Sequence, residues 1–195
     1  MTTDVKIAVI YYSATGTVAE IAREIADAAE KCSAEVRLRS VVGTAPSADP
    51  VPLATSADLI WADGVIMGSP TRFGNVAAEF KMFLDSLGDV WHEQLLADKV
   101  YSAFAATSSR HGGQEATLLA LMTSFHHFGG IVVAPGYTSP EKFADGNPYG
   151  TAHYTAGGKR ALDDITRGAA RVQAERVVRF ARAVKSADWR GGVEV

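Results

Sequence analysis

The sequence contains one cysteine, Cys32, among 195 residues. A lone thiol excludes an intrachain disulfide, and together with the lack of a signal-peptide pattern it predicts a reducing, cytoplasmic environment. Cys32 follows a predicted helix, where a partly buried packing role explains it better than a redox role.

The sequence also lacks an excess of charge of one sign and lacks long apolar runs. The 19 Lys and Arg residues are interspersed with 22 Asp and Glu residues, which gives a formal net charge of -3 at pH 7. This balance provides no basic stripe for nucleic acid and no polybasic patch for a membrane surface. No apolar run is long enough to cross a bilayer. We therefore expect neither nucleic acid nor a membrane as a partner.

Several motifs of other enzyme classes are missing. No Gly-x-Gly-x-x-Gly follows a strand, no Gly-x-Ser-x-Gly is present, and the histidines do not have metal-ligand spacing. Gly157-Gly158-Lys159-Arg160 lacks the upstream glycine and the final hydroxyl residue of a P-loop. These absences argue against Rossmann dinucleotide-binding domains, hydrolases, kinases and metalloenzymes, and no metal site is predicted.

Strand-like and helical segments alternate along the chain, of which 47% is hydrophobic. This composition suffices for one packed core and no linker or repeat divides the sequence, so we predict a single domain over residues 1–195 with a short tail at 188–195. Apolar runs typical of covered parallel strands occur at Ile7–Tyr12, Glu35–Arg39, Gly64–Met67, Val100–Ala105 and Ile131–Ala134.

Apolar residues at helical spacing lie between these runs. The stripes comprise Val18, Ile21, Ala22, Ile25 and Ala29; Val76, Phe80, Phe83, Leu84 and Leu87; Ala116, Leu118, Leu119, Met122 and Thr123; and Val177, Ala181 and Val184. The alternation predicts an α/β fold, a doubly wound parallel sheet of about five strands with helices on both faces. In such a sheet a ligand lies beyond the carboxyl ends of the strands, so the loops after the first, third and fourth strands should surround one crevice.

The first of these loops is suited to a phosphate. Residues Ser13-Ala14-Thr15-Gly16-Thr17-Val18 form a hydroxyl-rich turn between a buried strand and a helix. The first amides of a helix have no partners within it, and the helix dipole favours an anion there. Since the turn contains no Lys or Arg, neutral donors would hold the phosphate; ordinary helix capping is the alternative interpretation.

The other two loops combine glycine with polar and aromatic side chains. Pro70-Thr71-Arg72-Phe73-Gly74-Asn75 offers a hydroxyl, a cation and a flat ring, which suits a planar ligand with polar edges. Thr107-Ser108-Ser109-Arg110-His111-Gly112-Gly113 precedes the next helix. Turn formation and capping explain either loop taken alone, whereas three such loops at one sheet edge indicate a binding site.

With these motifs the sequence resembles the WrbA-type NAD(P)H:quinone oxidoreductases of the flavodoxin-like superfamily. The turn at 13–17 is similar to the flavodoxin phosphate loop, and residues 70–75 are similar to the flavin loop of WrbA-type proteins. Further matches, in the same order over nearly the whole chain, are Gly112-Gly113-Gln114-Glu115, His126-His127 with Gly129, Asn147-Pro148-Tyr149-Gly150 and Ala156-Gly157-Gly158. The resemblance implies a flavodoxin-like strand order of 2-1-3-4-5, bound FMN, two-electron reduction of quinones by NADH or NADPH, and a homotetramer whose active sites draw on more than one subunit.

The resemblance also implies roles for single residues. Those for the FMN phosphate are Ser13, Ala14, Thr15, Gly16, Thr17 and Val18; those for the flavin ring are Pro70, Thr71, Arg72, Phe73, Gly74, Asn75, Thr107, Ser108, Ser109, Arg110, His111, Gly112, Gly113 and His127. Trp91, Phe73 and His127 would bind substrate, with Trp91 and His127 holding a quinone or nicotinamide face to face with the flavin. His127 and Arg72 would stabilise the negative charge that develops on reduction, so the predicted catalytic residues are His127, Trp91 and Arg72.

Each predicted catalytic residue has a structural alternative. Trp91 could pack against a helix end, and Arg72 could form an ion pair with Glu79. His126 and His127 are neighbours and face different directions on a helix, so at most one of them can point into the site.

Two features depart from the family pattern. Thr15 stands where WrbA-type proteins often carry an aromatic residue that contacts the nicotinamide side. Arg110 and His111 stand where many relatives have a run of glycines, in a slightly longer loop. A cation there is compatible with recognition of NAD(P)H phosphates and equally with exposure to solvent.

A long segment at about 136–160 carries aromatic residues among glycines and prolines, namely Tyr137, Phe143, Tyr149 and Tyr154. Loops of this length are often lids or interfaces, and exposing these rings together would be costly. We expect them to be buried against a neighbouring subunit or over the flavin. A surface loop folded on its own side chains is the alternative.

Two functions are then compatible with the sequence. One is an FMN enzyme that takes hydride from NAD(P)H and reduces a quinone; the other is a flavodoxin-like carrier that passes single electrons between proteins. A carrier usually needs a strongly acidic face, which a net charge of -3 does not suggest. The aromatic segment, Trp91 and His127 favour the enzyme. An interaction protein without flavin would be favoured only if FMN failed to bind.

Overall fold

The computed structural model describes residues 5–41 and 51–187, so the predicted tail at 188–195 lies outside the described residues. The strands are β1 (Val5–Tyr11), β2 (Ala34–Ser40), β3 (Gly64–Arg72), β4 (Asn75–Val76), β5 (Val100–Thr107), β6 (Ile131–Val132) and β7 (Thr151–Tyr154). The helices are α1 (Thr17–Lys31), α2 (Ser56–Trp61), α3 (Ala78–Asp85), α4 (Gly88–His92), α5 (Gln114–His127), α6 (Pro140–Asp145) and α7 (Asp164–Ser186).

The predicted doubly wound parallel sheet is confirmed. Its strands pair in parallel in the order β2-β1-β3-β5-β6, which is the expected order when these strands are counted along the chain. The chain leaves β1 toward one edge to form β2 and returns to the other side of β1 to form β3, so the topological switch point lies between β1 and β3. Ligand sites of such folds lie at this point, beyond the carboxyl ends of the strands.

The edge beside β5 is occupied by two separate segments, which the sequence did not predict. β6 is shorter than the predicted strand at Ile131–Ala134 and pairs with the beginning of β5. β7 pairs with the end of β5, from Phe104 opposite Thr151 to Thr107 opposite Tyr154. The long segment predicted at about 136–160 therefore contains α6 and a strand of the sheet rather than forming one continuous loop.

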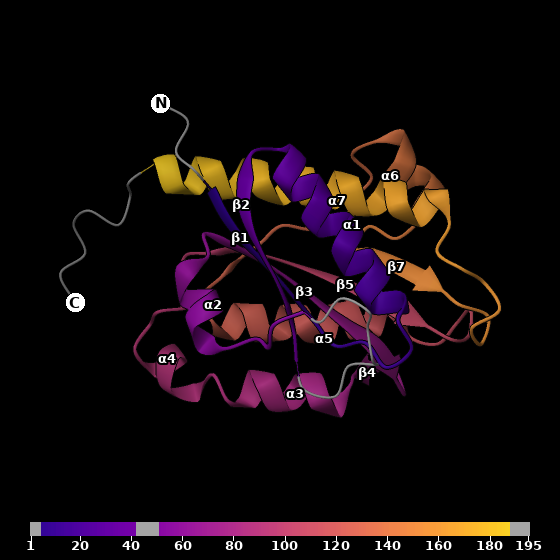
Figure 1. Cartoon of the computed structure of the whole chain (residues 1–195), viewed down its shortest axis with the longest axis horizontal. Helices are drawn as coiled ribbons and strands as arrows, with labels where there is room; N and C mark the ends of the chain where they lie inside the picture. The colour runs from indigo at the N-terminus through magenta and orange to yellow at the C-terminus, as the bar shows by residue number, and fades with distance from the viewer. Residues whose placement is uncertain (1–4, 42–50, 188–195) are drawn as a thin grey trace.

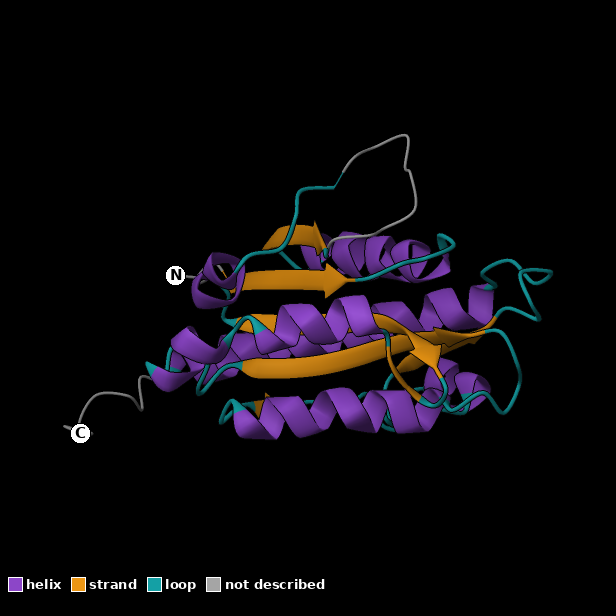
Figure 2. Ribbon diagram, turned by 90° about the horizontal axis from the view of Figure 1, so that it is seen from below, coloured by secondary structure: helices purple, strands orange, loops and turns teal. Residues whose placement is uncertain are grey.

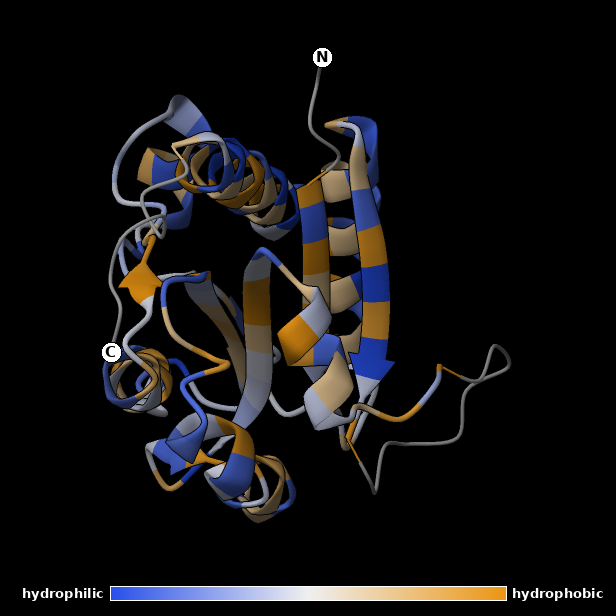
Figure 3. Ribbon diagram, turned by 90° about the vertical axis from the view of Figure 1, so that its left-hand side faces the viewer, coloured by the Kyte–Doolittle hydropathy of each residue, from blue (hydrophilic) through white to orange (hydrophobic). Residues whose placement is uncertain are grey.

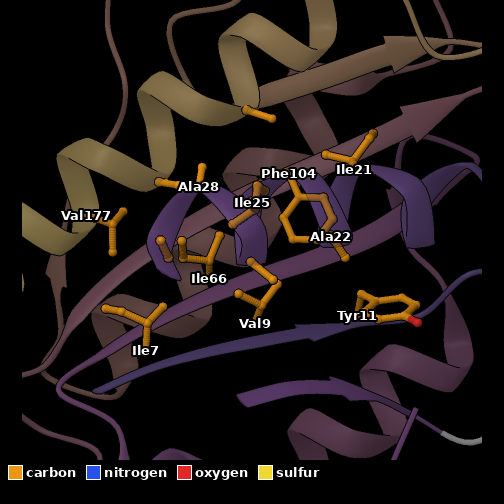
Figure 4. Packing of buried hydrophobic residues seen from close by; sticks show 14 of the residues in the cluster. Ile7, Val9, Tyr11, Ile21, Ala22, Ile25, Ala28, Ile66, Phe104 and Val177 are labelled. Carbon is orange, nitrogen blue, oxygen red and sulfur yellow. The ribbon is translucent and has the colours of Figure 1, made fainter. Parts of the chain in front are cut away.

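Helices cover both faces of the sheet because successive side chains of β1 point to opposite sides. Ile7, Val9 and Tyr11 belong to one core with residues of α1 and α7, and Figure 4 shows them in the cluster that also contains Phe104 and Val177. Ala8 and Ile10 belong to the opposite core, which contains residues of α2, α3 and α5. Figure 1 accordingly shows α1 and α7 on one side of the sheet and α3 and α5 on the other, and in Figure 2 the helices run along the strands.

The outer strand β2 differs from the central strands in its sequence. Its residues AEVRLRS alternate between polar and apolar, and Figure 3 shows this alternation as bands along the strand. Alternation is typical of a half-covered edge strand, whereas the inner strands β3 and β5 are buried over nearly their whole length. Among the residues that the structure describes, none of the helices combines the length and apolarity that crossing a bilayer requires.

Candidate active site

A cavity of about 300 Å³ lies at the carboxyl ends of the central strands, at the lower end of the range typical of small-molecule sites. Segments that follow β1, β5 and β7, together with the end of β3, form its walls. The lining residues are Ser13, Ala14, Thr15, Thr17, Val18, Pro70, Thr71, Arg72, Ala106, Thr107, Ser108, Thr155, Gly157 and Gly158. The predicted loops after the first, third and fourth parallel strands therefore do meet around one crevice.

The N-terminus of α1 forms one wall and is open to a ligand. The N-cap residue, Gly16, has a φ of 97°, and no side chain caps the helix. The buried Ser13 hydroxyl accepts a hydrogen bond from the Gly16 amide at 3.1 Å, which shapes the turn without covering the first amides of the helix. These amides, the hydroxyls of Thr15 and Thr17, and the helix dipole form a donor set that fits a phosphate dianion.

The second wall is a β-hairpin rather than the loop that the sequence predicted at 70–75. Thr71 and Arg72 at the end of β3 pair antiparallel with β4, and the turn consists of Phe73 and Gly74, whose φ values are 51° and 78°. Pro70, Thr71 and Arg72 line the cavity. Phe73 is fully exposed at the tip of the turn, so its ring does not line the cavity within this chain.

Arg72 is the one charged side chain among the described residues of the cavity lining. The ion pair with Glu79, considered as an alternative, is not formed; Arg72 instead donates to the Thr71 carbonyl at 3.3 Å. Glu79 accepts a hydrogen bond from the Tyr12 hydroxyl at 2.8 Å. A hydrogen bond from its own backbone amide, followed by the Tyr12 bond, lowers the pKa of Glu79, while burial raises the pKa of Tyr12. The Arg72 guanidinium is therefore not neutralised by direct contact with this carboxylate.

The loop after β5 contributes a third wall, but only its first part reaches the cavity. Thr107 and Ser108 line it, and the Thr107 hydroxyl donates to the Ser109 carbonyl at 2.9 Å. Ser109, Arg110 and His111 are exposed and lie outside the lining. The guanidinium carbon of Arg110 lies 5.5 Å from the centre of the Tyr154 ring.

Gly112 and Gly113 end the loop and begin α5. Gly113 is the N-cap, has a φ of 93°, and no side chain caps the helix. A Cβ at Gly113 would lie 2.6 Å from the Cα of Gly74, so a glycine is needed for α5 to meet the β3–β4 hairpin. The Thr117 hydroxyl strengthens this junction, because it lies 3.1 Å from the Thr71 hydroxyl and 3.3 Å from the Asn75 carbonyl.

The segment after β7 forms a fourth wall, and its residues are missing from the predicted site. The Thr155 amide donates to the Thr107 carbonyl at 2.8 Å, and the Gly157 amide donates to the Ser108 carbonyl at 3.0 Å. These bonds place Gly157 and Gly158 at the cavity. The resemblance of Ala156-Gly157-Gly158 to the family pattern was the one sequence signal for this wall. The position of this segment beside β5 follows from the pairing of β7 with β5, which the sequence did not predict.

Trp91 and His127 lie together but not at this cavity. The Trp91 indole nitrogen donates to the backbone carbonyl of His127 at 2.7 Å, so Trp91 does contact the end of a helix. α5 begins beside the cavity and ends with the exposed His126 and His127 at the opposite end of the sheet, where the Asp98 amide bonds to the Gly129 carbonyl. Figure 1 shows α4, which carries Trp91, far from β4 and β7.

The aromatic residues of the long segment remain largely exposed in this chain. The rings of Tyr137 and Phe143 stack with centroids 5.2 Å apart, and the Tyr137 hydroxyl donates to the Gly146 carbonyl at 3.0 Å. Tyr149 is also exposed. Within one chain Tyr137 and Phe143 thus pack on each other, and Tyr154 directly precedes Thr155 of the cavity lining.

Comparisons with known proteins agree with this geometry. Residues 5–145 match the family model described as NADPH-dependent FMN reductase. The chain is 40% identical over 180 residues to an NAD(P)H dehydrogenase (quinone) from Deinococcus radiodurans, covering 84% of this chain and 90% of the relative. It is also 40% identical over 178 residues to a quinone oxidoreductase from Triphysaria versicolor, covering 82% and 87%. A flavodoxin-like, WrbA-like protein from Agrobacterium tumefaciens superimposes with a TM-score of 0.72 at 25% identity, over 92% of this chain and 99% of that structure.

Proposed function

The chain belongs to the NADPH-dependent FMN reductase family, and on this basis we propose that it transfers two electrons from NADH or NADPH to a quinone through bound FMN. Curated relatives carry the name NAD(P)H dehydrogenase (quinone) and align over most of their length. A one-electron carrier is not favoured, because the relatives named above are quinone oxidoreductases, whereas the similar flavodoxin structures share only the fold.

The uncapped N-terminus of α1 carries the proposal most directly. Its amides and the hydroxyls of Thr15 and Thr17 form the donor set for the FMN phosphate. Pro70, Thr71 and Thr107 would then border the flavin ring, with the backbone of residues 109–113 beyond them. When bound, FMN supplies the redox chemistry, since it accepts a hydride and passes two electrons on.

The side chain of Arg72 would stabilise negative charge and would not transfer a proton. It lines the cavity and no carboxylate among the described residues forms a salt bridge with it. A guanidinium retains its charge at physiological pH, so it stabilises negative charge that develops on the flavin edge or on a quinone oxygen. Neutral donors such as the Thr71 hydroxyl would orient the ring without opposing this charge.

The proposed roles of Trp91 and His127 require a second copy of the chain. Both are exposed at the end of the sheet opposite the cavity, so they can approach a flavin only in a neighbouring subunit. Exposed apolar side chains on α3 and α5, Met82 and Leu119, support assembly through this side of the molecule. We propose the homotetramer in which each cavity is completed by Trp91 and His127 of another subunit, and a cytoplasmic location.

The test is the visible spectrum of the FMN-loaded protein under anaerobic conditions. Adding NADPH or NADH should bleach the flavin absorbance with one nucleotide consumed per flavin, and a soluble quinone should restore the absorbance completely. If FMN binds but neither nucleotide bleaches it, the proposed function is wrong and the single-electron carrier takes its place. If FMN does not bind, the interaction protein without flavin takes its place.

A further inference from the structure

Arg110 and Tyr154 form a cationic platform at the rim of the cavity. Ser108, two residues before Arg110, lines the cavity, and so does Thr155, directly after Tyr154. The guanidinium carbon of Arg110 lies 5.5 Å from the centre of the Tyr154 ring, within the range of a cation–π contact. The platform therefore lies next to two residues of the cavity lining, on segments that form two of its walls.

Backbone hydrogen bonds fix the two loops that carry the platform. The Thr155 and Gly157 amides donate to the carbonyls of Thr107 and Ser108, and the Gly112 amide donates to the Ser109 carbonyl at 3.1 Å. The first two bonds join the segment after β7 to the loop after β5, and the third closes a turn within that loop around Arg110. Arg110 is thus held near the rim by the fold, although its side chain is exposed.

The charge of Arg110 has no carboxylate partner among the described residues of the chain. Arg160, in the segment after β7, differs in this respect because it forms a salt bridge with Asp163. A guanidinium in a cation–π contact retains N–H groups that can bind a planar or tetrahedral anion. The platform is therefore a site for an anion from outside the chain.

The flavin phosphate is not that anion. The turn at the start of α1 offers it neutral donors and a helix N-terminus, and Arg110 lies outside the cavity lining. The second anion in the reaction is the nicotinamide nucleotide, which carries a pyrophosphate and, in NADPH, a further phosphate on the ribose. A contact at an exposed rim also suits a ligand that must leave before the quinone enters.

We propose that Arg110, held by Tyr154, binds a phosphate group of the nicotinamide nucleotide. This inference rests on the proposed function, because it assumes that NADH or NADPH is the electron donor. It makes Arg110, which the sequence analysis placed with the flavin ligands, a determinant of nucleotide binding instead.

The experiment compares the FMN-loaded full-length protein with Arg110→Ala, Arg110→Lys and a control, Arg179→Ala. Arg179 is matched because its guanidinium carbon also lies 5.5 Å from an aromatic ring, that of Phe180, but on α7 and outside the cavity lining. Arg110→Ala should raise KM for the nucleotide roughly tenfold, the loss expected for one charge-assisted hydrogen bond. It should leave kcat at saturating nucleotide, and the rate at which quinone reoxidises the dithionite-reduced enzyme, close to those of the wild type.

Two further arms distinguish the phosphate that is bound. An equal increase of KM for NADPH and NADH assigns Arg110 to the pyrophosphate, whereas an increase for NADPH alone assigns it to the ribose phosphate. Arg110→Ala should make KM for the nucleotide less dependent on salt concentration. Arg110→Lys should recover part of the affinity and part of this salt dependence. Arg179→Ala should behave as the wild type.

Calorimetric titration of oxidised holoenzyme with NADP⁺ and with NAD⁺ tests the platform without turnover. Weaker binding of NADP⁺ to Arg110→Ala than to Arg179→Ala supports the inference even if the nucleotide proves not to reduce the flavin. The experiment therefore tests nucleotide binding by Arg110 separately from the proposed reaction. Unchanged KM and nucleotide affinity in Arg110→Ala, no binding of either NADP⁺ or NAD⁺ to the wild type, or loss of FMN from Arg110→Ala would each overturn it.

Discussion

Gly113 and Gly74 bring the β3–β4 hairpin into contact with the beginning of α5. The Cβ of any other residue at Gly113 would lie 2.6 Å from the Cα of Gly74, and the φ of 93° is one that L-residues rarely adopt. The contact between the β3–β4 hairpin and the loop before α5 therefore requires a residue without a side chain at position 113. The sequence indicated a glycine-rich loop at this position, but the requirement for close approach is visible only once the two loops are side by side.

Gly113→Ala should destabilise the protein more than Gly146→Ala. Both glycines have positive φ, 93° and 77°, so both substitutions incur the left-handed conformational penalty of about 1–2 kcal/mol. At Gly146 no atom lies within 4 Å of the new Cβ, whereas at Gly113 the hairpin has to move. Urea unfolding measures the free energies, and the amount of FMN retained after gel filtration should fall only for Gly113→Ala. Equal losses for the two variants would contradict this account.

The positions of several candidate residues at the cavity follow from the sequence, while their roles toward a cofactor stay predictions. The Ser13 to Val18 turn and Thr107 lie at the cavity because they directly follow central strands, and strand ends are readable from apolar runs. Phe73 lies at the exposed tip of a hairpin, a result of the antiparallel pairing of β3 with β4. That pairing involves only two residues on each strand, which is too short to produce a sequence pattern.

The long elements with a clear apolar pattern were predicted, whereas most of the short ones were not; β6, within the predicted strand at Ile131–Ala134, is an exception. α1 carries the stripe from Val18 to Ala29, and β1 carries an unbroken apolar run, so both follow from the sequence. α2 and α4 contain six and five residues, which is less than two helical turns. β7 contains four residues and is shorter than a typical strand. The sequence of β7, TAHY, is not a run of apolar residues that would indicate a strand. Its place in the sheet comes from tertiary pairing with β5.

The element α6 contains a buried ion pair that composition alone would not suggest. The Lys142 ammonium is fully buried, donates to the Asp145 carboxylate, and lies 3.1 Å from the Gly150 carbonyl. Burial lowers the pKa of Lys142 and raises the pKa of Asp145, since each charge is taken out of water. The pair connects α6 to the residue just before β7, so it joins the inserted segment to the sheet.

Removing one member of this pair should be more harmful than removing both charges. Lys142→Met leaves the Asp145 carboxylate buried and unpaired, which should cost about 3–5 kcal/mol of unfolding free energy. The double variant Lys142→Met with Asp145→Asn removes both charges and should recover most of that loss. Thermal and urea unfolding of the two variants measure the difference. If the double variant is no more stable than Lys142→Met, the pair does not act as a compensated unit.

For the whole molecule, exposed apolar side chains on the α3 and α5 side predict self-association. Met82→Glu and Leu119→Glu should shift the proposed tetramer to smaller species in light scattering, because each would introduce a charge into the proposed apolar contact. Ile165→Glu on α7 is the control, since Ile165 is 47% exposed and Leu119 is 45% exposed. Quinone reduction should fall with dissociation in the first two variants only. A fully active monomer would contradict the proposed contribution of Trp91 and His127 to a neighbouring cavity.

The division of the sheet edge between β6 and β7 has a thermodynamic consequence for the cofactor. Three walls of the cavity are built on strands of the central core, while Thr155, Gly157 and Gly158 depend on β7 and on the hydrogen bonds that join it to the end of β5. A ligand that contacts all four walls binds only when residues 133–160 are folded onto the sheet. Cofactor binding therefore stabilises the folded form of this segment, and a change that populates its unfolded form lowers the apparent affinity in proportion to the fraction that remains folded.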